Sequence, residues 1–151
     1  VNLSSPVGAT ILDGQGTGII KNDDAIRYDS TSPTLSISDA SIKEENSNFK
    51  HLVFTISLSA PYRDQITFQT SITSGTATVG SSTPADFGYG LRNEQLEIYT
   101  IPAGVTSIKL PVPIFGDTVS EPDETLFVNL SSPVGATILD GQGTGTIVND
   151  D

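Results

Sequence analysis

Carboxylates gathered in a few short segments are the side chains of this sequence that could do chemistry. They are Glu44 and Glu45, Asp86, the stretch with Asp117, Glu121, Asp123 and Glu124, and the closing pair Asp150 and Asp151. Each segment falls at the end of an expected strand, and antiparallel strands can bring ends that are distant in sequence to one pole of a sandwich. Two like charges about 4 Å apart repel by roughly 1 kcal/mol even in water. Convergence at one pole would therefore favour a bound divalent cation.

Calcium suits such a group better than other metals do. It accepts 6 to 8 oxygen ligands in loose geometry, whereas magnesium requires a near-ideal octahedron. Zinc and copper favour His or Cys, and the chain has no Cys and one His, His51, which we expect on the surface. The acidic stretch lacks the D-x-[DN]-x-[DN]-G frame of an EF-hand, and DGQGTG is not the nonapeptide calcium repeat. The alternative that these acids are solvated loop charges stays open.

Composition excludes several classes of function. The 151 residues carry seven Lys and Arg against eighteen Asp and Glu, a formal net charge of -11, which disfavours binding to nucleic acid or to anionic lipid. With 36% hydrophobic and 17% charged residues the chain should bury a core. The absence of Cys, the single His and the lack of a G-x-S-x-G motif argue against an enzyme. No apolar run reaches the roughly 20 residues that span a bilayer, so we expect no membrane insertion and any targeting signal outside this segment.

The sequence contains a long internal repeat. Residues 1–24 and 128–151 differ only at Ile19 against Thr146 and at Lys21 against Val148. Such close identity indicates a segment of a tandem array. We expect residues 1–24 to be the C-terminal hairpin of a preceding repeat, or a strand-exchanged tail, and residues 25–151 to be one complete domain.

Within that domain the hydrophobic pattern has period two, as in strands with one buried face. The expected inward rows are Leu35 and Ile37; Leu52, Phe54, Ile56 and Leu58; Ile66, Phe68 and Ile72; Ile108, Leu110, Val112 and Ile114; and Leu126, Val128 and Leu130. Turn-forming residues separate the rows, and no helical periodicity is present. The pattern predicts an all-β, immunoglobulin-like antiparallel sandwich of about seven strands. Pro111 and Pro113 predict an edge strand, and Asp140-Gly141 predicts a hairpin between the last two strands.

From about Pro33 to Asp151 the chain resembles a Calx-β domain. The resemblance rests on SISDASIKEEN, on GTAT followed by Ala85-Asp86-Phe87, on IPAGVTSIKLPVPIFGD, on SEPDETLFVNLSSPVGA and on the terminal GTGTIVNDD. It implies a seven-stranded sandwich that, in the calcium-binding members of the family, holds calcium at one pole among loops and strand ends.

The resemblance also implies a ligand set. The matching positions are Glu45, Asp86, Asp117, the backbone carbonyl near Val119, Glu121, Glu124, Asp150 and Asp151. Glu44 and Asp123 are interpreted as flanking charges. This chain departs from some calcium-binding members at Asn149, which begins the triplet Asn149-Asp150-Asp151, and at Gly116, where those members have an acid.

Three functions follow as hypotheses. The first is a non-catalytic calcium-binding structural module of a repetitive extracellular or cell-surface protein of a bacterium, contacting neighbouring repeats and rigidified by calcium. The second is a regulatory calcium sensor of a transporter. The third is an adhesive or carbohydrate-contact module that uses Tyr62, Phe87, Tyr89 and Tyr99, although we expect core or rim packing for these rings. The duplicated tail would either dock on its own unit, displace the C-terminal copy, or form a strand-exchanged homo-oligomer.

Overall fold

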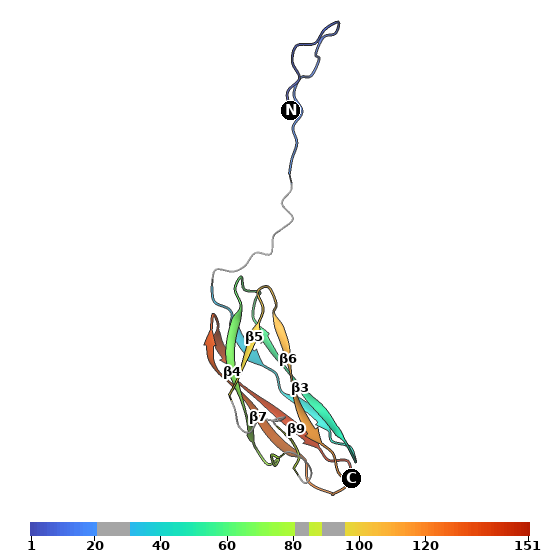
Figure 1. Cartoon of the computed structure of the whole chain (residues 1–151), viewed down its shortest axis with the longest axis vertical. Coiled ribbons are helices and arrows are strands. Elements are labelled where there is room, and N and C mark those ends of the chain that lie inside the picture. Colours follow the sequence, from blue (N-terminus) through green and yellow to red (C-terminus); the bar gives the residue numbers. More distant parts are fainter. Residues whose placement is uncertain (21–30, 81–84, 89–95) are drawn as a thin grey trace.

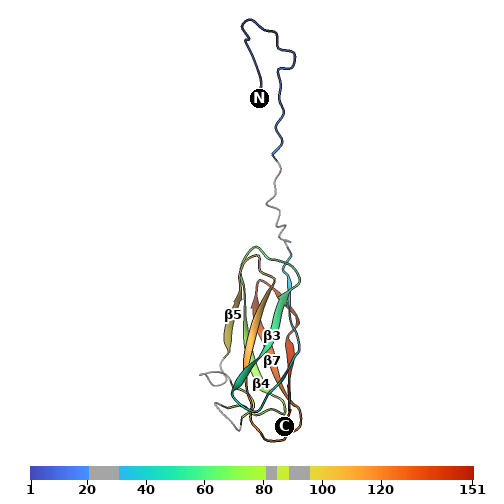
Figure 2. The same cartoon turned by 90° about the vertical axis from the view of Figure 1, so that its right-hand side faces the viewer.

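The chain folds as a two-layered β-sandwich (Figure 1). The computed structural model describes residues 1–20, 31–80, 85–88 and 96–151, and no helix occurs among them. The described residues form nine strands: β1 (Thr34–Ile37), β2 (Ala40–Lys43), β3 (Phe49–Leu58), β4 (Ile66–Ser74), β5 (Glu97–Ile101), β6 (Ser107–Phe115), β7 (Glu124–Val134), β8 (Thr137–Asp140) and β9 (Gln142–Val148). One sheet has the order β6-β3-β1-β8 and the other the order β2-β9-β7-β4-β5. The strands run along the long axis of the sandwich, as the turned view in Figure 2 shows.

The core lies between the sheets and confirms the period-two pattern. Every predicted inward residue is buried except Ile72 and Ile108, which are partly buried and pack against the core. Phe54, Phe68 and Phe87 are among the largest side chains that are fully buried. Burial of a side chain of this size contributes about 1.5–3 kcal/mol, so these three rings are major contributors to the stability of the sandwich.

Two chain segments pass from one sheet to the other, which explains why nine strands appear where about seven are expected. β1 pairs with β3 and β8, whereas β2, two residues further on, pairs with β9 in the opposite sheet. The crossing is fixed by Ser38 and Asp39, whose side-chain oxygens accept hydrogen bonds from the backbone N–H groups of Thr55 (3.1 Å) and Thr144 (2.7 Å). The pairings β1–β8 and β2–β9 are parallel, so the sandwich is largely, not wholly, antiparallel.

The second crossing corrects the hairpin predicted at Asp140-Gly141. β8 pairs with β1 in one sheet, and β9 pairs with β7 and β2 in the other, so the two strands are not partners of each other. The turn chemistry itself is present, because the side chain of Asp140 accepts a hydrogen bond of 3.3 Å from the Gln142 N–H. This turn reverses no strand; it forms the corner at which the chain changes sheets.

The proline prediction is confirmed. β6, which contains Pro111 and Pro113, lies at the edge of its sheet. Among the described strands its partner is β3, and Ile114 near its end also forms an isolated bridge with Phe87. A residue without an N–H is tolerated there because the outer side of an edge strand has no ladder to complete.

Different parts of the chain lie at the two ends of the sandwich. In Figure 1, β1 begins at the end facing the N-terminal segment, and the chain terminates at the opposite end. The acidic segments gather at this second end, which we call the acidic pole. No helix in the described part of the chain is long and apolar enough to cross a membrane.

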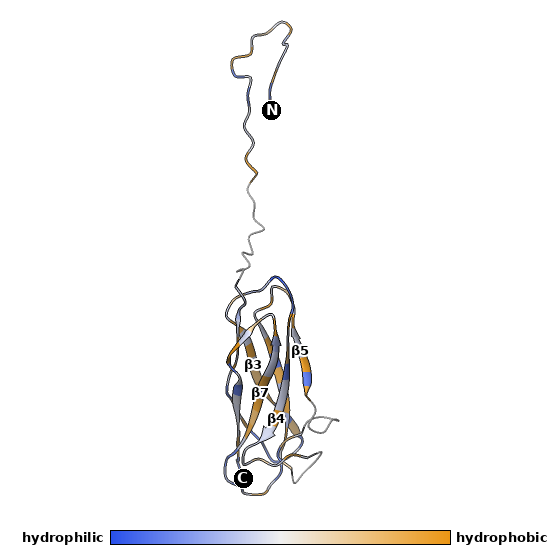
Figure 3. Cartoon of the chain, turned by 90° about the vertical axis from the view of Figure 1, so that its left-hand side faces the viewer, coloured by the Kyte–Doolittle hydropathy of each residue, from blue (hydrophilic) through white to orange (hydrophobic). Residues whose placement is uncertain are grey.

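Residues 1–20 lie outside the sandwich, beyond the end opposite the acidic pole (Figure 1). Several of their apolar side chains are exposed, including Val1, Leu3, Val7 and Leu12. Figure 3 shows hydrophobic residues along this segment in orange. Assignment of residues 1–24 to a preceding repeat stays a prediction.

Candidate metal site

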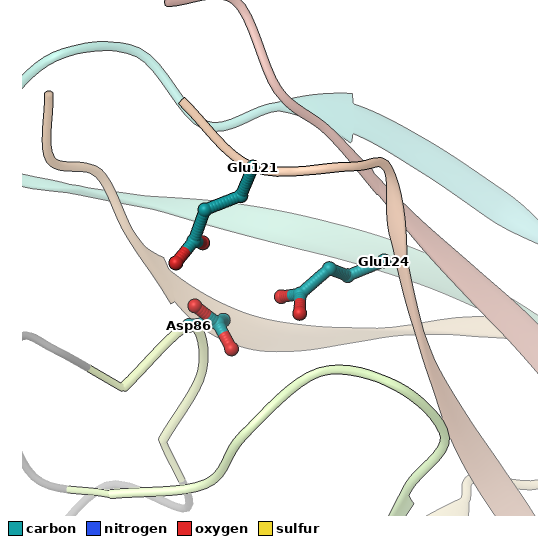
Figure 4. A group of neighbouring side chains, drawn as sticks. All are labelled: Asp86, Glu121 and Glu124. Atoms are coloured by element: carbon teal, nitrogen blue, oxygen red, sulfur yellow. The ribbon is translucent and has the colours of Figure 1, made fainter. Parts of the chain in front are cut away.

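Three carboxylates from separate segments face one another at the acidic pole (Figure 4). Asp86 comes from the described segment 85–88, Glu121 from the loop 116–123 between β6 and β7, and Glu124 from the first residue of β7. One oxygen of each lies within 4.8 Å of the others. We call these residues the acidic trio. Asp86 is buried, Glu124 is half-buried and Glu121 is exposed, so the trio opens to solvent on one side.

Asp86 is held rigidly. Its Oδ2 accepts hydrogen bonds from the backbone N–H of Thr78 (2.6 Å) and from the Thr78 hydroxyl (2.8 Å). Its backbone carbonyl accepts a hydrogen bond from the Phe115 N–H (2.9 Å), and the adjacent Phe87 is in the core. The two hydrogen bonds from Thr78 therefore orient the carboxylate of Asp86, and burial of Phe87 anchors the adjacent backbone.

Among the trio, Glu124 has a strongly raised pKa. Burial, a hydrogen bond with Asp86 and repulsion from Asp86, Glu121 and Glu44 together raise the pKa of Glu124 to about 8. Without a cation this carboxyl therefore retains a proton near neutral pH. A divalent ion at the trio would remove the repulsion and replace that proton.

Glu44 belongs to this pole as well, which corrects its interpretation as a flanking charge. It is 5% exposed, and its Oε1 accepts a hydrogen bond of 2.8 Å from the side-chain amide of Asn149. Its pKa is raised, first by burial and then by repulsion from Asp117, Glu121 and Asp86, although the Asn149 hydrogen bond opposes the shift. The period of β2 could have identified it, because Glu44 is in phase with the partly buried Ala40 and Ile42.

The loop 116–123 is attached to the end of β9. The amide of Asn149 donates a second hydrogen bond of 3.2 Å to the carbonyl of Val119, and the Asn149 N–H donates one of 3.3 Å to Asp123. Within the loop, the carboxylate of Asp117 accepts a hydrogen bond of 2.8 Å from the Val119 N–H. The Ser120 hydroxyl donates to the backbone carbonyl of Asp151 at 3.3 Å. Asp117 and Val119 thus lie at the predicted pole, with their oxygens engaged in loop contacts.

Glu45, Asp150 and Asp151 form a rim around the pole and have other partners. Glu45 forms an ion pair with Lys50, and its backbone N–H donates to Asp150 at 3.0 Å. Asp150 also lies 4.0 Å from the Lys43 amine, and Asp151 accepts a hydrogen bond from the Asn46 side chain. None of the ion pairs found in the described ranges involves the acidic trio. Basic side chains therefore partly neutralise the rim, whereas none of the ion pairs among the described residues neutralises the trio.

Gly116 is required by a close backbone approach. A Cβ atom at this position would lie 2.0 Å from the carbonyl oxygen of Glu45 and 2.7 Å from that of Glu44. No side chain fits there without a shift of the backbone. Glycine at 116, where an acid was noted in some family members, therefore has a packing reason in this chain.

The donor set of the trio fits a hard cation. All its donors are carboxylate oxygens, the ligands that calcium and magnesium prefer. His51 is exposed on β3 and makes an edge-to-face contact with Phe49 at 5.5 Å between ring centroids, so it is a surface residue as expected. Within the part of the chain that the structure describes, no nitrogen or sulfur ligand joins the trio.

Comparison with known proteins finds its matches among solved structures. No family model matches the chain, and no curated protein sequence matches it. The apo-form Calx CBD1 domain is 18% identical, with 78% of this chain and 99% of that chain covered and a TM-score of 0.59. CBD12 from CALX1.2 and the calcium-binding domain CBD12 of CALX1.1 are each 18% identical over 78% of this chain, with TM-scores of 0.62 and 0.61. This chain covers 44% of each of the two CBD12 chains. Together these matches show that the chain has a Calx-β-like fold of the immunoglobulin-like sandwich type.

Proposed function

We propose that this chain is a non-catalytic calcium-binding structural module of a repetitive extracellular or cell-surface protein. The observation that carries the proposal is the acidic trio: three carboxylates within 4.8 Å of one another, outside the ion pairs found in the described residues. The likeness to domains described as calcium-binding is consistent with it. The raised pKa of Glu124, about 8, indicates how strongly the pole favours a positive charge in place of its proton.

In the proposed site, Asp86, Glu121 and Glu124 are the inner ligands. Glu44 is close enough to interact electrostatically with Asp86 and Glu121 and supplies a fourth carboxylate. The remaining predicted ligands, Glu45, Asp117, the Val119 carbonyl, Asp150 and Asp151, would complete one or more coordination spheres by exchanging their present partners for the ion. Calcium accommodates such a mixed set of 6 to 8 oxygens more readily than magnesium does.

Calcium would stabilise the pole by connecting segments that come from different parts of the chain. The trio joins the segment 85–88, the loop 116–123 and the start of β7. A ligand that binds only the folded state at a hundredfold excess over its Kd stabilises that state by about 2.7 kcal/mol. Even a weak site would therefore stabilise the folded state where calcium is abundant, as it is outside cells.

A tandem arrangement gives this stabilisation a mechanical role. β1 begins at one end of the sandwich and the chain terminates at the acidic pole, at the other end (Figure 1). Consecutive repeats of this kind would be joined in line, with each acidic pole next to the junction with the following unit. Calcium at the pole would then stiffen both the unit and its junction.

The aromatic residues give little support to an adhesive module. Phe87 is fully buried, and Tyr99 is partly buried and stacks on Phe68 with 6.2 Å between ring centroids. Tyr62 is also partly buried and packs against the core, and Tyr89 lies outside the described residues. The described rings therefore pack in or at the edge of the sandwich, as expected.

Isothermal titration of the full chain with calcium and with magnesium tests the proposal. We expect saturable calcium binding, weaker magnesium binding, and loss of the inner site in the double variant Asp86→Asn with Glu124→Gln. Asp64→Asn is a matched control, because Asp64 forms an exposed ion pair with Arg63 in the turn between β3 and β4. Absence of calcium binding, together with a melting temperature that chelator does not change, would contradict the proposed function.

A further inference from the structure

The chain contains two copies of one structural segment and one place to hold it. Residues 128–147, the resident copy, form most of β7 and all of β8, together with β9 as far as Ile147. Residues 1–20, the N-terminal copy, have the same sequence except for Ile19 in place of Thr146. The resident copy pairs with β4, β1 and β2, whereas the N-terminal copy lies outside the sandwich.

The two copies share several local backbone features despite these different surroundings. The Leu3 N–H donates to the Gly14 carbonyl at 2.7 Å, as the Leu130 N–H does to that of Gly141 at 2.7 Å. The bridge between Asn2 and Gln15 corresponds to the β7–β9 pair of Asn129 and Gln142.

The turn conformations agree as well. Ser5 and Ser132 have φ values of 53° and 49°, and Gly8 and Gly135 have φ values of 76° and 84°. The N-terminal copy therefore already has the turn conformation of the resident copy, although residues 1–20 form an isolated bridge and no strand.

The side chains that form core contacts in one copy are exposed in the other. Val128, Leu130 and Ile147 are 0%, 7% and 2% exposed, whereas the matching Val1, Leu3 and Ile20 are 93%, 62% and 98% exposed. Burial of apolar surface is favourable by about 25 cal/mol per Å², so burial of the N-terminal copy would lower the free energy of the chain. The surface that fits it is the one that holds the resident copy.

The N-terminal copy also meets the tightest steric requirement of that place. A Cβ atom at Gly143 would lie 2.8 Å from the carbonyl oxygen of Ser38, and one at Gly145 would lie 2.7 Å from a methyl group of Leu52. The N-terminal copy has glycine at both matching positions, Gly16 and Gly18.

We propose that residues 1–20 can replace residues 128–147 in the sandwich of the same chain. Connectivity allows the exchange: the fourteen peptide steps from Ile20 to Thr34 span up to about 50 Å when extended. The longest strand, β7, has 11 residues and measures about 37 Å. Residues 124–127 of β7 have no counterpart in the N-terminal copy, so their continuity with the resident copy favours the resident arrangement.

A pair of matched substitutions in the full chain tests the exchange. Leu130→Asp places a charge in the core, which should unfold a sandwich that has no replacement segment. If residues 1–20 replace the damaged copy, Leu130→Asp keeps a cooperative melting transition, lowered by about 5–10 °C. Leu3→Asp alone leaves the transition unchanged, and the double variant loses it. Loss of the transition in Leu130→Asp alone, or equal melting of Leu130→Asp and the double variant, would overturn the proposal.

Cysteine cross-linking identifies which tail is bound. The chain has no Cys, so Asn2→Cys and Ser71→Cys introduce the only two thiols. Ser71 is the partner of Asn129 across β4 and β7, and Asn129 corresponds to Asn2. Added to Leu130→Asp, this pair should form a disulfide within a single chain. A disulfide found only in dimers, or no disulfide, would contradict replacement by the tail of the same chain.

Discussion

The side-chain amide of Asn149 donates a hydrogen bond of 2.8 Å to Oε1 of Glu44, although the two residues are 105 positions apart. The same amide donates to the Val119 carbonyl at 3.2 Å. One side chain at the end of β9 thus joins the residue that follows β2 to the loop before β7. Asn149 thereby organises the acidic pole without adding to its negative charge.

Replacing Asn149 with aspartate should lower the stability of the calcium-free protein and increase the stabilisation that calcium provides. Asn149→Asp removes a donor from Glu44 and places a carboxylate beside it, so we expect the calcium-free protein to lose about 1–3 kcal/mol of stability. Calcium should restore more of this loss than it adds to the native chain, because the added charge favours the ion. Urea unfolding with calcium and with chelator measures both effects. Asp39→Asn, at the crossing between β1 and β2, is a control outside the pole. A variant that calcium stabilises no more than the native chain would contradict this role.

The calcium-free protein should lose stability as pH rises from about 4.5 to about 8. The pKa of Glu124 is raised to about 8 by burial and by its acidic neighbours, from an ordinary value of 4.5. Between these values the folded state binds more protons than the unfolded chain, so stability is complete below the lower value and falls as pH approaches the upper one. The raised pKa of Glu44 acts in the same direction. Melting scans in chelator should show this decline, and Glu124→Gln should flatten it. A native profile as flat as that of the variant would contradict the assignment.

Calcium binding should release protons for the same reason. Near pH 7 we expect up to about one proton per ion bound at the trio, and tighter binding as pH rises to about 8. Titrations in two buffers with different ionisation enthalpies measure the number released. Binding heats that are independent of the buffer would show that the ion does not displace a proton from Glu124.

Thr78 should support calcium binding without being a ligand. Its hydroxyl donates a hydrogen bond of 2.8 Å to Oδ2 of Asp86, and Thr78→Val removes that donor at nearly constant volume. A neutral hydrogen bond contributes about 0.5–1.5 kcal/mol, and one to a charged group about 1.5–3 kcal/mol, so calcium affinity should fall by at least about twofold. Thr78→Ser, which keeps the hydroxyl, should restore it. Equal affinity in the native, valine and serine proteins would show that this hydrogen bond does not position Asp86.

Gly116→Ala should destabilise the sandwich. Its Cβ atom would lie 2.0 Å from the carbonyl oxygen of Glu45, so the backbone of the loop or of the segment that follows β2 must move. Overpacking of this kind typically costs about 1–3 kcal/mol. Gly16→Ala is a matched control, since no atom lies within 4 Å of its Cβ position. Denaturant midpoints of the two variants measure the difference, and equal midpoints would mean that the approach at Gly116 is easily relieved.

The sequence predicted the sandwich well because strand burial is a local, periodic property. Leu52, Phe54 and Ile56 alternate with polar or exposed residues whatever lies opposite them, and all three are buried. The edge position of β6 was equally predictable, because Pro111 and Pro113 cannot complete a ladder on both sides. The corner at Asp140-Gly141 was misread as a hairpin, because a turn signal shows that the chain bends but does not show which sheet it enters next.

What the sequence by itself determined is the set of elements: strands with one apolar face, acids at their ends, and a duplicated segment. Tertiary structure decided which acids meet. Asp86, Glu121 and Glu124 converge, whereas Glu45 pairs with Lys50, and Glu44 takes the buried position beside Asn149. The physical reason is that periodicity fixes which face of a strand is buried. The distance between side chains on different strands depends on register, sheet crossing and loop path, which only the packed core sets.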